Sequence, residues 1–351
     1  MEYSNKLILD PNFNKLINVG YEAPSNIALI KYWGKKENQI PLNSSLSFTL
    51  KNCVTRTKIS AIPREKVNND FSFRVIFEGK ESSSFKSKIE TFFSKISHHY
   101  HFLHQLNLKI ETSNTFPHSA GIASSASSMA AIALCLCQME KEIFGSLRDS
   151  EEFLNKASYL ARLGSGSASR SIYGGLVSWG SVSDLYATSH YDINGVFETY
   201  KDAILIVDAS QKEVSSTKGH SLMKDHVYRD QRLKNAKHRY SELLLAMAEQ
   251  DIKKFGELVE SEALELHALM MTSNPSYTLM RPNTLALIEK IKYFRKELKL
   301  PMYFTLDAGP NIHLLYPAAY QDKVTNLINS ELKVYTSNVI YDEVGKGPKE
   351  L

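Results

Sequence analysis

Cysteine is scarce in this chain of 351 residues. The three cysteines, Cys53, Cys135 and Cys137, are too few for a disulfide framework, and none forms a Cys-x-x-Cys pair typical of a metal site. Cys135 and Cys137 stand in an Ala/Leu-rich run, where cysteine serves as a small apolar residue. This usage favours a reducing compartment, so we expect a cytoplasmic protein.

Long apolar runs are missing as well. No stretch of the sequence approaches the roughly 18 apolar residues of a membrane span. The first residues, MEYSNKLILDPNF, do not have the pattern of a signal peptide. We therefore expect no membrane partner.

Charge of one sign does not dominate either. The 42 Lys and Arg residues against 38 Asp and Glu leave a net charge of +4. This excess is too small, and too dispersed, to indicate a nucleic-acid partner, although it is compatible with an anionic small molecule.

The common phosphate-binding motifs are also absent. The sequence has no G-x-x-x-x-G-K-[ST], which excludes a Walker-type site. GSGSAS at 164–169 resembles the dinucleotide fingerprint, but it ends in Ser and follows a helical pattern rather than a strand. We reject it as a dinucleotide site.

The length exceeds that of one typical core and predicts two domains, which we place at 1–195 and 196–351. Strands and helices follow one another without regular alternation, which predicts an α+β fold. The expected strands are 55–62, 71–79, 107–114, 175–180, 202–209, and a pair on either side of the turn at 307–311. The expected helices are 82–103, 124–142, 151–164, 222–248, 251–272 and 283–298.

The stretch FPHSAGIASSASSMAAIAL, residues 116–134, crowds serines around the start of a helix. A helix N-terminus presents unpaired N–H groups and favours anions, and Gly121 lets a ligand approach the backbone. One interpretation is therefore a nucleotide-phosphate cradle. The other is a small-residue helix packed on a sheet, with the serines doubling as caps. In the phosphate cradle as well, we expect Ser127 and Ser128 only to cap or pack the helix.

Three further positions carry chemistry that the residues alone leave open. Asp307 follows an apolar strand and is either a general base or a turn residue before Gly-Pro. Arg170 is either a bidentate carboxylate ligand or a surface arginine. Lys31 and its neighbours in IALIKYWGKK are either site cations or solvated lysines at a strand end.

A resemblance to a known family favours the functional interpretation of each of these residues. P-x-x-x-G-I-A-S-S-A, from Pro117 to Ala126, resembles the phosphate loop of the GHMP kinase superfamily. APSNIALIKYWGKK (23–36), NSSLS (43–47), ARLGSGSASRSIYGGLVSWG (161–180) and DAGPN (307–311) resemble the diphosphomevalonate decarboxylase family, in the family's order. The resemblance implies a two-domain GHMP kinase fold with the active site in the cleft between the domains.

The resemblance also implies an activity. Members use ATP to phosphorylate the 3-hydroxyl of mevalonate 5-diphosphate, which then loses phosphate and CO₂ to give isopentenyl diphosphate in the mevalonate pathway of isoprenoid biosynthesis. ATP as co-substrate, Mg²⁺ and a homodimer are expected with it. The alternatives are a mevalonate or phosphomevalonate 3-kinase, a monophosphate-selective decarboxylase, or a non-catalytic ligand sensor.

Site residues follow from the resemblance position by position. Asp307 is implied as the base that orients the 3-hydroxyl, Lys31 as a nearby cation, and Arg170 as the grip on the substrate carboxylate. Ser125 is implied in alignment of the γ-phosphoryl group, and Ser124 in phosphate or Mg²⁺ binding. The implied substrate contacts are Asn26, Tyr32, Lys35, Ser165, Ser167, Ser215, Ser216 and Lys218, and the implied ATP contacts are Ser113, Pro117, Gly121, Ile122, Ala123, Ser124 and Ser125.

The chain departs from the family pattern at several places. Ser169 stands where the family has Cys, and P-H-S-A-G replaces P-T-A-A-G. In the substrate loop, Thr217 and His220 stand where bacterial members often carry Arg and Met. Lys218 could supply the missing cation, so these changes bear on affinity more than on the chemistry.

Overall fold

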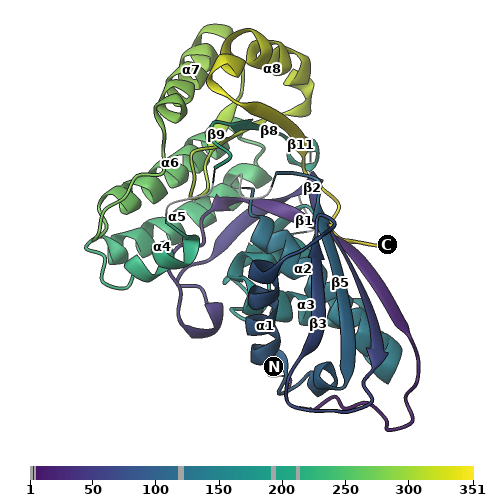
Figure 1. The fold of residues 1–351 in the computed structure, drawn as a ribbon. Helices are drawn as coiled ribbons and strands as arrows, with labels where there is room; N and C mark the ends of the chain where they lie inside the picture. The colour runs from purple at the N-terminus through teal and green to yellow at the C-terminus, as the bar shows by residue number, and fades with distance from the viewer. Residues whose placement is uncertain (1–2, 4, 118–121, 191–194, 211–213) are drawn as a thin grey trace.

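The computed structural model describes residues 3, 5–117, 122–190, 195–210 and 214–351. Two β-sheets, each covered by helices, form the lower and upper parts of the molecule in Figure 1. The architecture is α+β, as the irregular order of elements predicted.

The first sheet is built on a long antiparallel pair, β1 (Ile17–Ile30) and β2 (Ser45–Pro63). Its strand order is β12-β1-β2-β5-β3-β4, and β6 and β7 extend it from β2. The last strand, β12, returns the C-terminal end of the chain to the edge of this sheet, beside β1. The other strands are β3 (Ser72–Phe77), β4 (Lys80–Glu81), β5 (Leu106–Asn114), β6 (Leu176–Trp179), β7 (Thr188–His190) and β12 (Lys349–Glu350).

Three helices, α1 (Ser83–Ile96), α2 (Ser124–Phe144) and α3 (Ser150–Gly164), pack on this sheet. Small side chains such as Ala130 and Ala131, both fully buried, let α2 approach β1 and β2 closely. The hydroxyl groups of Ser127 and Thr55 lie 2.7 Å apart in this interface, and Ser128 is also buried. These two serines therefore pack the helix, as expected.

The second sheet is antiparallel, with the order β11-β8-β10-β9. Helix α6 lies against β9, where Gly256 is required because a Cβ there would approach the ring of Tyr303 to 2.0 Å. The strands are β8 (Lys201–Ile206), β9 (Tyr303–Thr305), β10 (Ile312–Tyr316) and β11 (Asn338–Glu343). The helices of this half are α4 (Ser216–Leu222), α5 (Arg229–Ala248), α6 (Ile252–Met271), α7 (Pro282–Leu298) and α8 (Gln321–Leu327).

Two helices are shorter in the structure than the sequence predicted. The helix expected over 82–103 ends at Ile96, and the residues after it hydrogen-bond to the N-terminal segment instead of continuing the helix: the Leu7 N–H donates to the His99 carbonyl at 2.8 Å, and the Phe102 N–H donates to the Leu7 carbonyl at 3.0 Å. The helix expected over 222–248 begins at Arg229. Before it, the ring of His226 accepts the Tyr228 N–H and contacts the Leu269 carbonyl, which holds the chain in a turn.

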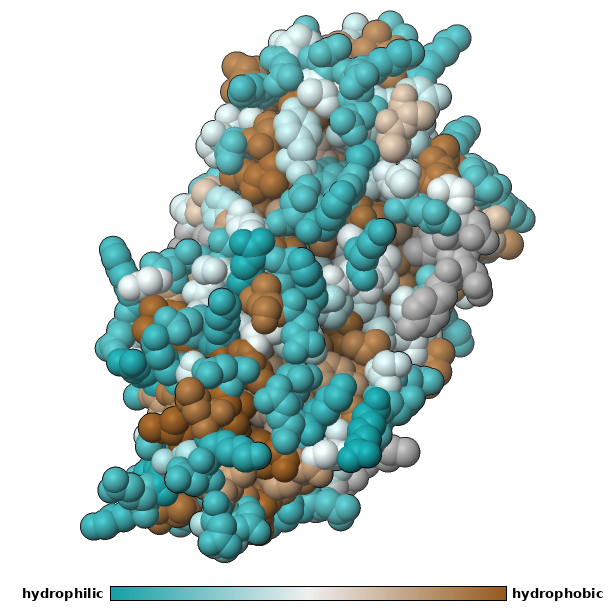
Figure 2. Space-filling model, turned by 90° about the vertical axis from the view of Figure 1, so that its right-hand side faces the viewer, coloured by the Kyte–Doolittle hydropathy of each residue, from teal (hydrophilic) through white to brown (hydrophobic). Residues whose placement is uncertain are grey.

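Polar side chains dominate the face drawn in Figure 2, and apolar side chains form separate patches between them. Among the described residues, no helix has the length and apolar character needed to cross a membrane.

Candidate active site

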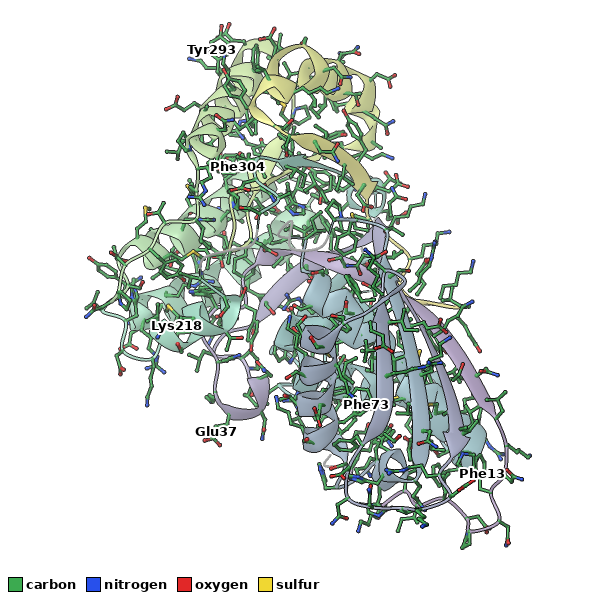
Figure 3. All side chains as sticks on the ribbon, viewed as in Figure 1. Phe13, Glu37, Phe73, Lys218, Tyr293 and Phe304 are labelled. Carbon is green, nitrogen blue, oxygen red and sulfur yellow. The ribbon has the colours of Figure 1, made fainter. Side chains whose placement is uncertain are left out.

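A cavity of about 520 Å³ gathers residues from elements that are far apart in the sequence. The loop after β1, marked by Glu37 in Figure 3, descends between α1 and the helix α4 that carries Lys218. The start of α2, the turn at 164–170 and the segment after β9 also line the cavity, together with residues of α1, α4 and α6. The predicted site residues on this wall are Asn26, Lys31, Tyr32, Lys35, Ala123, Ser125, Ser165, Ser167, Arg170, Ser215, Ser216 and Asp307.

Lys31 and Asp307 form an ion pair across this wall. Lys31 directly follows β1, and Asp307 lies two residues beyond β9. The Lys31 Nζ lies 2.9 Å from Asp307 Oδ1 and also donates to the Ala28 carbonyl at 2.6 Å. The lysine side chain is only 3% exposed, whereas that of Asp307 is 26% exposed and so reaches the cavity. Burial lowers the pKa of Lys31, and the negative charge of Asp307 opposes that shift.

Arg170 is held as a rigid, buried fork. Its Nη1 donates to Ser45 Oγ at 2.6 Å and its Nε to Ser47 Oγ at 3.0 Å, while Nη2 lies 3.3 Å from Asn26 Oδ1. Burial lowers the pKa of Arg170 to about 10, so the guanidinium stays charged near neutral pH. A fixed planar cation at a cavity wall suits a carboxylate ligand.

Tyr32 and Lys35 meet at Gln39 on the loop after β1. The Tyr32 hydroxyl donates to the Gln39 carbonyl at 3.0 Å, and Lys35 Nζ donates to Gln39 Oε1 at 2.7 Å. Gly166 makes room for this arrangement, because a Cβ there would lie 2.6 Å from the Tyr32 hydroxyl. Burial lowers the pKa of Lys35. These donors, together with the serines of the 164–170 turn, can bind the oxygens of an anion.

His220 contributes a neutral hydrogen-bond donor. The Gly34 N–H donates to its Nδ1 at 3.0 Å, so the ring proton resides on Nε2. The ring lies 4.5 Å from that of Tyr32 and 4.8 Å from that of Trp33, measured between centroids. Burial lowers the pKa of His220 to about 3. A methionine at this position could not donate a hydrogen bond.

The start of α2 opens onto the same cavity. Ala123 has a left-handed backbone, with φ of 42°, and the helix begins at the next residue. Ala123 and the exposed Ser125 line the cavity, so the positive end of the helix dipole faces it. Gly121, predicted in the same loop, lies outside the described residues.

Not every predicted contact reaches this cavity. Of the described residues, Ser113, Pro117, Ile122, Ser124 and Lys218 are not part of its wall. Ser113 lies on β5 opposite Arg56, and the Ile122 carbonyl accepts the Ser25 hydroxyl at 2.6 Å. Their assignment to ATP or substrate stays a prediction.

Sequence reasoning missed several residues that shape the site. Ser45 and Ser47 belong to the NSSLS motif at 43–47. Their spacing of two on a strand would have placed both on one face. Arg232, Glu262 and Gln39 gave no local signal, because they act only through contacts made in the folded chain.

In this α+β chain, a serine-rich helix opens onto a cavity lined by residues of both helix-covered parts. Solved structures that share this architecture over nearly the whole chain have the GHMP kinase fold. Comparisons with known proteins identify the family within this class. The model "Diphosphomevalonate decarboxylase-like N-terminal domain" matches residues 23–191, and "Mevalonate 5-diphosphate decarboxylase C-terminal domain" matches residues 203–343. The chain therefore belongs to the diphosphomevalonate decarboxylase family.

Individual relatives are similar to this chain over nearly its whole length. The diphosphomevalonate decarboxylase of Candida albicans is 28% identical, over 93% of this chain and 96% of its own. The crystal structure of the Staphylococcus aureus mevalonate diphosphate decarboxylase is 28% identical, covers 96% and 98% of the two chains and has a TM-score of 0.82. A complex of MDDEF with MVAPP, AMPPCP and magnesium is 26% identical, covers 96% and 99%, and also has a TM-score of 0.82.

Proposed function

We propose that this chain catalyses the ATP-dependent decarboxylation of mevalonate 5-diphosphate to isopentenyl diphosphate. The observation that carries the proposal is the ion pair between the buried Lys31 and the cavity-facing Asp307, on the wall that also presents Arg170. Membership of the decarboxylase family supports it.

Asp307 accepts the proton of the 3-hydroxyl as the hydroxyl oxygen attacks the γ-phosphorus of ATP and the bond to ADP breaks. Lys31 keeps this carboxylate in place, because its amine lies 2.9 Å away in a buried position. Phosphoryl transfer depends mainly on such positioning and on charge stabilisation.

Arg170 holds the carboxylate of the substrate through the second half of the reaction. The C3–O bond to phosphate breaks, the C1–C2 bond breaks to release CO₂, and its electron pair forms the new double bond. A guanidinium fixed by Ser45, Ser47 and Asn26 can orient the carboxylate without moving. Tyr32, Lys35, Ser165, Ser167, Ser215 and Ser216 would bind the diphosphate, with Lys218 beside them.

The residues present fit ATP and a magnesium ion held mainly by phosphate oxygens. Among the described residues, no group of three or more His, Cys, Asp or Glu side chains could hold a metal. Mg²⁺ is commonly held by one or two protein oxygens together with substrate phosphates and water, and Ser124 would supply such an oxygen. When bound, the ion neutralises phosphate charge. The α2 N-terminus and Ser125 orient the phosphate chain of ATP.

The division into domains at residue 195 and a homodimeric assembly also belong to this proposal. Size-exclusion chromatography coupled to light scattering tests the dimer.

The decisive experiment incubates the purified chain with Mg-ATP and mevalonate 5-diphosphate labelled at C1, and measures ADP and CO₂ separately. Equal amounts of both products are expected. ADP without CO₂ would identify a 3-kinase, and preference for the 5-phosphate a monophosphate-selective enzyme. Ligand binding without either product would identify a sensor.

A further inference from the structure

Side chains of helices α5 and α6 hydrogen-bond to the backbone of Lys31 at its carbonyl and at its N–H. Glu262 on α6 accepts the Lys31 N–H through Oε1 at 2.9 Å. Arg232 on α5 donates through Nη2 to the Lys31 carbonyl at 3.2 Å, where the Asn43 amide also donates at 3.0 Å. Arg232 and Glu262 also bond to each other, with Arg232 Nη1 2.8 Å from Glu262 Oε2. The contacts thus form a closed ring through one peptide segment.

The ring is buried, and its two side chains, Arg232 and Glu262, form an ion pair. The side chains of Arg232 and Glu262 are both 0% exposed. Burial alone would raise the pKa of Glu262, but the guanidinium of Arg232 outweighs it and lowers that pKa, so the carboxylate is charged. Charge-assisted hydrogen bonds in such surroundings restrain geometry more firmly than neutral ones.

The same helix also holds the other partner of the catalytic pair. His267, one and a half turns after Glu262 on α6, has its Nε2 3.1 Å from the Asp307 carbonyl oxygen, which can only accept. Between them on the helix, Leu266 lines the cavity. Helix α6 therefore contacts the backbone of Lys31 at one point and the backbone of Asp307 at another.

We infer that Glu262 is a positioning residue, through which helix α6 sets the spacing between Lys31 and Asp307. The inference rests on the proposed function, in which these two groups work as a pair. Glu262 touches no reacting atom in this scheme. It acts by fixing the residue that directly follows β1, so that the Lys31 amine stays within 2.9 Å of the Asp307 carboxylate.

Helix α6 offers a matched control in Glu260. This carboxylate is also buried on α6, also pairs with an arginine, Arg295, at 2.6 Å, and also accepts a backbone N–H, that of Phe304. Its partners lie on the side of α7 and β9 rather than at Lys31. Replacement of either glutamate removes an arginine partner and a backbone acceptor. Glu262 has the additional partner Arg239 at 3.0 Å, and its partner Arg232 is fully buried whereas the side chain of Arg295 is 23% exposed, so kcat is compared together with Tm for each variant.

The test compares E262L and E262Q with E260L and E260Q in the full chain. Residues that orient the ligands of a metal typically contribute about 10–100-fold in activity. We expect a fall in kcat of comparable size for E262L, with KM for both substrates changed less than about 3-fold. E262Q keeps an acceptor for the Lys31 N–H and should retain more activity than E262L. The Glu260 variants should keep kcat within about 3-fold of wild type, even where they lower Tm equally.

A pH profile gives a readout that a general loss of stability would not produce. The charged groups that face Lys31 are Asp307, Glu262, Arg170 and, at its carbonyl, Arg232. Removal of the Glu262 charge leaves the Lys31 cation less favoured, so the alkaline limb of kcat should move to lower pH in E262Q and stay in place in E260Q.

Failure of the inference and failure of the proposed function are distinguishable. Wild-type enzyme that releases no CO₂ refutes the function, and crystal structures of E262L and E260L then decide the inference without activity. The Lys31–Asp307 distance should exceed about 4 Å in E262L alone; an unchanged distance overturns the inference. In active enzyme, equal kcat losses in E262L and E260L, or an unchanged kcat in E262L, also overturn it. If E262L fails to fold, the pH profile of E262Q decides.

Discussion

Replacement of Asp307 by Asn tests the proposed base with little change of shape. The amide keeps an oxygen near Lys31 Nζ but cannot take up a proton at neutral pH. Removal of a general base typically costs about 10²–10⁴-fold in rate, which corresponds to about 3–5 kcal/mol at 1.36 kcal/mol for each factor of ten. The cost in folding stability should stay below the about 3–5 kcal/mol of a broken, fully buried pair, because the Asp307 side chain is 26% exposed.

The assay follows ADP and CO₂ from mevalonate 5-diphosphate and, separately, ATP binding by calorimetry. Turnover should fall below about 1% of wild type while ATP binding survives. Asp208 provides the control, because it also follows a strand of the second sheet by two residues, is 30% exposed in its side chain and lies 3.5 Å from Arg281. D208N should keep wild-type turnover. A D307N enzyme that retains more than about 1% of kcat contradicts the base role.

Three further predictions follow from the walls of the cavity. R170K should lower kcat/KM for CO₂ release by about 100-fold or more, because an ammonium cannot reproduce the fork; near-normal CO₂ release would remove Arg170 from the mechanism. G166A should raise KM for the diphosphate substrate by displacing Tyr32, whose hydroxyl would lie 2.6 Å from the new methyl group, and an unchanged KM would separate Tyr32 from binding. His220 has a folded-state pKa of about 3, below its unfolded value, so the unfolded chain binds more protons and stability falls as pH drops below about 6.5, by about 2 kcal/mol at pH 5. Urea unfolding at pH 7 and pH 5 measures this loss; H220Q should lack it, and an identical pH dependence in both proteins would show that His220 is not its source.

Local patterns predicted some elements of the first half closely. The strand expected over 107–114 is β5 (Leu106–Asn114), and the small-residue run predicted α2 to within two residues of its end. The long strands β1 and β2 were predicted only in part, as a short apolar strand before Lys31 and as 55–62. Helix boundaries failed where tertiary contacts decided them, as at Ile96, after which the chain turns into the core. Propensity and periodicity carry no information on such contacts.

Only the site residues that belong to recognisable sequence motifs could be predicted. Asp307 and Lys31 could be selected because each stood in a recognisable segment, although 276 residues separate them. Glu262 stood in an amphipathic helix where a glutamate is ordinarily solvent-exposed. Its contact spans 231 residues to a backbone N–H, which has no side-chain identity to recognise. A sequence pattern therefore cannot show that this glutamate is buried or what it holds.

The two charged centres of the site depend on the fold in different ways. Arg170 is fixed by Ser45, Ser47 and Asn26, all of which belong to the first sheet, so its geometry needs no contribution from the second half. The Lys31–Asp307 pair joins the end of β1 to the segment after β9 and exists only where α5 and α6 pack against the first sheet. A change that loosens this packing should thus impair proton transfer at Asp307 before it impairs the grip on the carboxylate. In such a variant the loss appears in kcat while the substrate still binds, which is the pattern that separates positioning from binding.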